Sequence, residues 1–140
     1  MCGRPGGAIL SGVTVRSLLV DDNSRFLAAA RELLEREGIE VVGIASTSDD
    51  AARLAASLRP DVCIVDIDLG DESGFDLARR MAAAGDGAPP VVLISAYPER
   101  DFVDMIADSP ALGFLPKPEL SAARIRAMLA TRDAGESPPG

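Results

Sequence analysis

Five short apolar runs alternate with segments of helical character, and this alternation limits the fold more than any other feature of the sequence. None of the runs alternates cleanly with polar residues, which is typical of parallel strands covered on both faces. The runs occupy residues 15–20, 39–45, 62–65, 91–94 and 112–115. Because crossovers between parallel strands are right-handed, we predict an α/β fold, a doubly wound parallel sheet with helices on both faces.

The helical segments have recognisable ends. Their predicted starts are Phe26, Ser48, Ser73, Pro98 and Glu119. The first helix should stop at Gly38, the second before Pro60, the third near Gly85 and the fifth at Ala130, because glycine and proline are common just beyond helix ends. The fourth helix has Phe102, Met105 and Ile106 on one side.

Length and composition suit one domain with a sizeable core, since the chain has 140 residues, 47% of them hydrophobic. We expect disordered tails at 1–12 and 131–140 around a domain at 13–130. No stretch approaches the ~18 apolar residues of a membrane span, and the two cysteines form no disulfide framework. A cytoplasmic location is therefore expected.

Charge and residue content exclude several functions. The formal net charge is −8 and the basic residues form no stripe, so direct nucleic-acid binding is not expected. The chain has no histidine, which removes Ser-His-Asp and Cys-His catalysis and most catalytic zinc sites. Chemistry here must use carboxylates, hydroxyls, a thiol or a metal bound through oxygen.

Polar side chains follow four of the five predicted strands. Asp21 and Asp22 end the first, Asp66 the third and Ser95 the fourth, while the fifth leads into Lys117. Because the carboxyl ends of parallel strands meet at one edge, and ligands bind there, we expect these side chains to converge.

Three convergent carboxylates require a cation to stay ionised, and an all-oxygen site favours Mg²⁺. A carboxylate beside Mg²⁺ and an ammonium is a phosphoryl-transfer arrangement. Lys117 is the only lysine beside 13 arginines, and a compact ammonium is not equivalent to a forked guanidinium at such a site.

Each residue also has a plainer interpretation. Asp21 and Asp22 can cap the first helix, and Asp66 and Asp68 can be loop acids, because aspartate favours both positions. Ser95 can be an ordinary hydroxyl at a strand end. Each plain role can occur by chance. It is harder to explain by chance why all of these residues occur together in this order.

Over roughly residues 15–129 the chain resembles the receiver domain of bacterial response regulators. The resemblance rests on the ordered set Asp21, Asp22, Asp66, Ser95 and Lys117, the last followed by proline. It implies a flavodoxin-like sheet of strand order 2-1-3-4-5 with five helices.

The resemblance also implies roles. Asp66 would be the phosphoacceptor, and Mg²⁺ would be held by Asp21, Asp22, the Asp66 carboxylate and the backbone carbonyl of Asp68. Lys117 would bind the phosphoryl group. The bond from Lys117 to the next residue, a proline, is expected to be cis, as in the family.

The predicted switch residues are Ser95 and Phe114. The phosphoryl group would draw Ser95 inward and let Phe114 rotate, shifting a surface of helix four, strand five and helix five between two populations. Phe114 can equally be a plain core aromatic, since burial is the common fate of phenylalanine.

The expected function is that of a single-domain response regulator, phosphorylated by a histidine kinase or a phosphotransfer protein. It would signal through an output protein, with no enzymatic turnover beyond its own phosphorylation and dephosphorylation. Two alternatives stay open. Asp66, Ile67 and Asp68 resemble the nucleophile motif of haloacid-dehalogenase-like phosphatases, and a receiver fold can act as a constitutive docking module.

Overall fold

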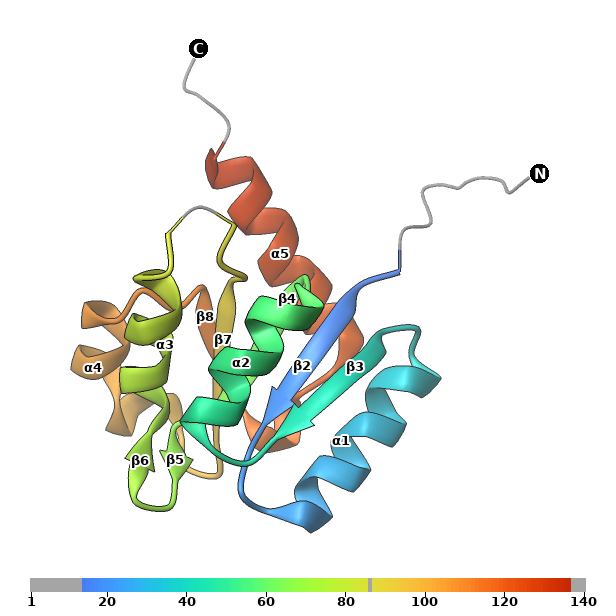
Figure 1. Cartoon of the computed structure of the whole chain (residues 1–140), viewed down its shortest axis with the longest axis horizontal. Helices are drawn as coiled ribbons and strands as arrows, with labels where there is room; N and C mark the ends of the chain where they lie inside the picture. Colours follow the sequence, from blue (N-terminus) through green and yellow to red (C-terminus); the bar gives the residue numbers. More distant parts are fainter. Residues whose placement is uncertain (1–13, 86, 137–140) are drawn as a thin grey trace.

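The sheet has the predicted architecture. The computed structural model describes residues 14–85 and 87–136, with side chains up to residue 131. The strands are β2 (Arg16–Val20), β3 (Glu40–Ala45), β4 (Val62–Asp66), β7 (Val91–Ser95) and β8 (Gly113–Pro116). They are all parallel and lie in the order β3-β2-β4-β7-β8 (Figure 1). In chain order this is 2-1-3-4-5, which confirms the flavodoxin-like fold.

Five α-helices and two short 3₁₀ turns accompany the strands, and the last turn and helix follow the final strand. They are α1 (Ser24–Arg36), α2 (Ser48–Leu58), α3 (Gly74–Ala82), η1 (Glu99–Asp101), α4 (Val103–Asp108), η2 (Lys117–Glu119) and α5 (Ala122–Glu136). The side chains of Asn23, Thr47 and Ser73 accept backbone N–H groups at the starts of α1, α2 and α3. Gly38, at φ 96°, follows the end of α1 as predicted.

The helices cover the sheet in two layers. The hydrophobic side chains of α1 and α5 share one core cluster around Leu19, Ile64 and Val92. Those of α2, α3 and α4 share the other, around Leu18 and Val65. Figure 1 shows α2 in front of the sheet and α5 behind it. Both faces are covered, which explains why the strands read as continuous apolar runs.

A small hairpin was not predicted. β5 (Asp68–Leu69) and β6 (Glu72–Ser73) pair antiparallel directly after β4. Gly70 at its turn has φ 74°, a conformation that favours glycine. The Glu72 carboxylate accepts the backbone N–H of Ser48 at 2.8 Å, which ties the hairpin to the start of α2. Strands of two residues leave no periodic pattern to detect in the sequence.

The fourth helix differs from its prediction. A 3₁₀ turn comes first, and the α-helix begins only at Val103. Phe102 and Ile106 pack against the core, but Met105 is 49% exposed. Met105, predicted on one side of the helix with Phe102 and Ile106, does not share their packing against the core, because α4 has six residues and buries none of them fully.

The end of the chain also differs. α5 runs from Ala122 to Glu136, so the expected boundary at residue 130 is wrong for residues 131–136. No glycine or proline occurs at residues 131–134, and the first glycine there is Gly135. Residues 1–12 and 137–140, which were expected to be tails, lie outside the described residues. Within the described part of the chain, no helix is long and apolar enough to cross a membrane.

The bond between Lys117 and Pro118 is trans, so the prediction of a cis bond is wrong. Pro118 lies at the start of the η2 turn, where the fixed φ of proline is compatible with a trans bond. Trans is also the commoner state of such bonds.

Candidate functional site

The predicted polar residues converge at the carboxyl edge of the sheet. Asp21, Asp66 and Ser95 are 1%, 5% and 3% exposed at the ends of β2, β4 and β7. Asp22 is exposed beside them, and Lys117 arrives from the end of β8. In Figure 1 this edge lies at the bottom, where the β2 and β3 arrowheads point and where the β5–β6 hairpin lies. The expected convergence is confirmed.

Lys117 joins the two buried carboxylates. Its Nζ lies 2.8 Å from Asp21 Oδ2 and 3.0 Å from Asp66 Oδ2. The lysine side chain is 15% exposed and both carboxylates are more deeply buried. One ammonium therefore compensates two carboxylates that water reaches poorly, and the cluster of these three groups keeps a net negative charge.

The same local device orients three of the side chains. Asp21 Oδ1 accepts the backbone N–H of Asn23 at 2.9 Å, and Asp66 Oδ1 accepts that of Asp68 at 3.0 Å. Ser95 Oγ accepts the N–H of the residue two positions on at 3.0 Å. Aspartate and serine favour such turns, in which a side chain accepts an N–H two residues later. Each strand end therefore holds its own functional side chain in place.

Burial and charge change two pKa values here. Burial raises the pKa of Asp66 to about 6, while the Asp68 N–H and Lys117 oppose this shift. For Lys117, burial acts to lower the pKa, but its contacts with Asp21 and Asp66 outweigh burial and raise the pKa above its ordinary value. The lysine is thus charged at neutral pH, and a further cation would favour the ionised form of Asp66.

The carboxylates fit a hard divalent ion. One oxygen from each of Asp21, Asp22 and Asp66 lies within 4.8 Å of the others. The cluster borders a pocket of about 210 Å³ that is also lined by Asp68, Ser95 and Lys117 among others. Carboxylate oxygens are the ligands that Mg²⁺ prefers, and the pocket leaves space for further oxygen atoms.

Phe114 lies in the core and not in this pocket. It is 7% exposed and its ring centroid is 6.2 Å from that of Phe102, which is 6.4 Å from that of Phe75. Phe114 pairs with Leu93 across β7 and β8, two positions before the pair formed by Ser95 and Pro116. The position agrees with both interpretations of Phe114, as core residue and as switch residue.

Sequence reasoning missed two contacts at the site. A Cβ atom on Gly74 would lie 2.2 Å from the backbone oxygen of Asp66, so only glycine lets α3 approach β4 this closely. The ring of Phe26 lies 4.3 Å from Lys117 Nζ. The sequence predicts Phe26 only as the start of the first helix, and no signal in the sequence pairs it with the lysine.

Comparisons with known proteins identify the family of this chain. The model of the response regulator receiver domain matches residues 17–130. The transcriptional regulatory protein PdtaR of Mycobacterium tuberculosis is 32% identical over 108 residues, covering 77% of this chain and 52% of that protein. A protein-glutamate methylesterase/protein-glutamine glutaminase of a Nocardioides species is 32% identical over 126 residues, covering 86% and 33%. The chain thus spans about half, or less, of these relatives.

Solved structures give the same result. The signal receiver domain of a modulated diguanylate cyclase from Desulfovibrio desulfuricans superposes with a TM-score of 0.73 at 27% identity, covering 89% of this chain and all of that one. That of the putative response regulator NarL from M. tuberculosis gives 0.71 at 26%, covering 89% and 98%. The chain belongs to the response regulator receiver domain family.

Proposed function

We propose that this protein is a phosphorylation switch in which Asp66 accepts a phosphoryl group from a histidine kinase or a phosphotransfer protein. The observation that carries the proposal is the buried contact of Lys117 with both Asp21 and Asp66, at 2.8 and 3.0 Å. A nucleophilic carboxylate, a neighbouring acid pair and one ammonium are the parts that phosphoryl transfer requires.

Mg²⁺ would be held by the carboxylates of Asp21, Asp22 and Asp66 and by the backbone carbonyl of Asp68. Bound there, the ion would neutralise charge on the phosphoryl oxygens. The three-carboxylate cluster supports this ligand set, since its oxygens lie within 4.8 Å of one another. Receiver domains in general bind Mg²⁺ at an acidic pocket.

Asp66 and Lys117 would share the chemical step. A carboxylate oxygen of Asp66 forms the bond to phosphorus, while the bond from phosphorus to the donor's imidazole nitrogen breaks and that nitrogen keeps the electron pair. Oδ1 of Asp66 is oriented by the Asp68 N–H. Lys117, now 3.0 Å from Oδ2, is in reach of oxygens on a phosphoryl group formed at that carboxylate.

The output surface would comprise α4, β8 and α5. Ser95 ends β7 beside β8, and Phe114 lies in β8 next to the half-buried Phe102 that precedes α4. Val103 and Met105 expose 54% and 49% of their surface on α4. Apolar side chains at this position would contact an output protein whose affinity changes when Ser95 and Phe114 move.

Intact mass after incubation with phosphoramidate, with and without Mg²⁺, tests the proposal. The wild type and the exposed control Asp104→Asn should each gain one phosphoryl group, and only with Mg²⁺. Asp66→Asn should gain none, and Lys117→Arg should react more slowly, because a guanidinium does not replace a compact ammonium at this position.

Two results would overturn the assignment. An adduct that persists in Asp66→Asn would place the phosphoacceptor elsewhere. Repeated release of phosphate without an adduct would instead support the phosphatase alternative. Mg²⁺ affinity gives a second check, because Asp66→Ala should weaken it if Asp66 is a ligand.

A further inference from the structure

The ammonium of Lys117 lies over the face of an aromatic ring. Its Nζ is 4.3 Å from the centroid of Phe26, within the range of a cation–π interaction. Phe26 belongs to the first turn of α1, whereas Lys117 follows β8. The two residues are therefore brought together by the fold and are remote in sequence.

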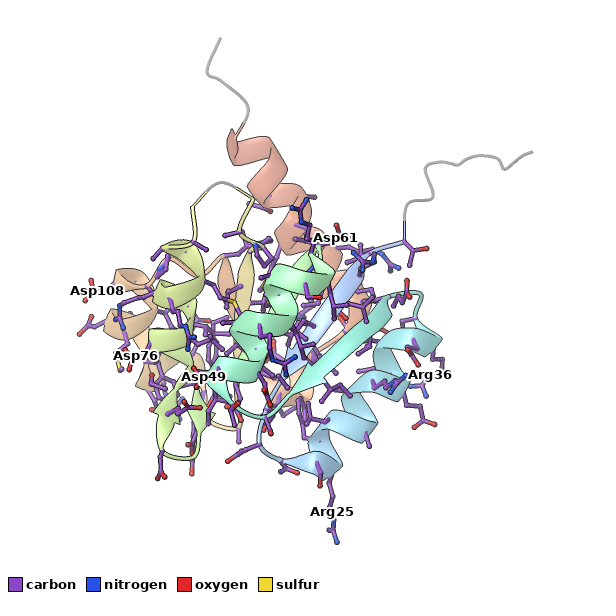
Figure 2. The ribbon with its side chains drawn as sticks, in the orientation of Figure 1. Arg25, Arg36, Asp49, Asp61, Asp76 and Asp108 are labelled. Carbon is purple, nitrogen blue, oxygen red and sulfur yellow. The ribbon has the colours of Figure 1, made fainter. Side chains whose placement is uncertain are left out.

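Asp21 and the aromatic ring are fixed by one hydrogen-bonded segment. The backbone N–H of Asn23 donates to Asp21 Oδ1, and Asn23 Oδ1 accepts the N–H groups of Arg25 and Phe26 at 3.0 and 3.1 Å. Figure 2 shows Arg25 pointing away from the molecule. Phe26 is half-buried and packs against the cluster shared by α1 and α5. The cap of α1 thus sets the place of the ring relative to Asp21.

Lys117 has few other partners among the residues that the structure describes. An ammonium carries three N–H groups, and among the described residues Asp21 and Asp66 are the two carboxylates within 4 Å of Nζ. The ring of Phe26 covers part of the ammonium that these carboxylates leave free. Its negative face attracts the charge, and its carbon atoms exclude water from that side.

We propose that Phe26 is a positioning residue for Lys117. The inference rests on the proposed function, in which Lys117 moves its contact from Asp66 to the phosphoryl oxygens. In that exchange Lys117 loses its contact with Asp66 but keeps its contact with the ring of Phe26. Phe26 therefore keeps the ammonium aimed at the phosphoryl group and prevents it from swinging toward solvent.

The single lysine makes a direct structural test possible. With lysine isotopically labelled, the NMR spectrum of the full chain contains the side-chain resonances of Lys117 and no other lysine. Ring currents should shift the ε-methylene protons upfield, with nuclear Overhauser contacts to an aromatic ring. Phe26→Leu should remove both signals. Phe102→Leu, which replaces another half-buried ring, should preserve both.

Phosphorylation rates test the functional consequence. Phe26→Leu and Phe26→Met should slow phosphoryl uptake from phosphoramidate by between about twofold and thirtyfold, the range expected for loss of one cation–π contact. Phe26→Tyr, which keeps the ring, should stay close to the wild-type rate. Thermal unfolding of each variant shows that the rates come from folded protein, and Phe26→Met retains most of the packing volume if Phe26→Leu does not fold.

The outcomes separate the two proposals. Unchanged Lys117 resonances and wild-type rates in Phe26→Leu or Phe26→Met would overturn the role of Phe26. If the wild type takes up no phosphoryl group, the proposed function fails. The NMR comparison then still decides whether Phe26 holds the ammonium.

Discussion

Two helices on the same face of the sheet, α3 and α4, follow strands that end in site residues, yet they are held very differently. α3 follows Asp66 after the short hairpin, is capped by Ser73, and has five buried residues among nine. α4 follows Ser95 after a 3₁₀ turn, has six residues, lacks a side-chain cap and buries none.

Because of this difference, the elements on the two sides of the site should differ in how easily they are displaced. The backbone of α3 contacts the residue that directly follows β4, since Gly74 N–H donates to the Ile67 carbonyl at 2.7 Å. The α4 segment contacts the core through Phe102 and Ile106. Elements with few buried contacts shift at low free-energy cost. The comparison therefore indicates that Asp66 is fixed and lies beside a segment that is easily displaced.

Replacing one aromatic residue in α3 and one directly before α4 by alanine should give the largest difference in the free energy of unfolding. Phe75→Ala should lower the free energy of unfolding by about 3–5 kcal/mol, because the ring is fully buried. Phe102→Ala should cost only about 1–2 kcal/mol, since its ring is half-buried. Guanidinium unfolding measures both, and equal costs would break the comparison.

The close approach of α3 to β4 should also be sensitive to a single methyl group. Gly74→Ala should lower the free energy of unfolding by about 2–4 kcal/mol, because its Cβ meets backbone atoms that cannot yield. Gly113→Ala is the matched control, since its Cβ would meet the flexible side chain of Met128 at 3.1 Å. If urea unfolding shows that Gly113→Ala lowers the free energy of unfolding more than Gly74→Ala does, this account is contradicted.

Asp66→Asn should stabilise the metal-free protein at neutral pH by about 1–3 kcal/mol. The folded pKa of Asp66, about 6, lies above the ordinary value of 3.8, so the folded state binds this proton more tightly than the unfolded chain. The wild type therefore loses stability as pH rises from 4 through 6. When unfolding is measured from pH 4 to 8 with a chelator, Asp66→Asn should be more stable than the wild type above pH 6, and this gain in stability should disappear near pH 4.

A control at Asp104, which is exposed on α4, should show no such pH-dependent gain when replaced by asparagine. A gain in Asp66→Asn that persists unchanged at pH 4 would show that ionisation of Asp66 is not its cause.

Polar substitution on α4 should have the smallest effect on stability. Val103→Ser and Met105→Ser should each change the free energy of unfolding by no more than about 0.5 kcal/mol, since both side chains are about half exposed. Thermal unfolding checks this. A loss comparable to that of Phe102→Ala would show that α4 is packed more firmly than the contacts of Phe102 and Ile106 indicate.

The convergence of Asp21, Asp66, Ser95 and Lys117 could be predicted because it follows from topology: parallel strands bring their carboxyl ends to one edge. The strand order could be predicted only through the resemblance to receiver domains. The exposure of Met105 could not be predicted, because helical spacing does not show how closely a short helix approaches the sheet. The contact of Phe26 with Lys117 depends on two remote segments, and the trans bond before Pro118 depends on the local turn.

Hydrogen exchange of the protein with and without phosphorylation tests the coupling of a fixed acceptor to a movable segment most directly. Phosphorylation by phosphoramidate and Mg²⁺ should alter amide exchange in residues 96–116, which include α4 and β8, while α3 keeps its protection. If a phosphoryl group forms on Asp66 and exchange changes in α3 but not in α4, or changes in neither, the account is contradicted.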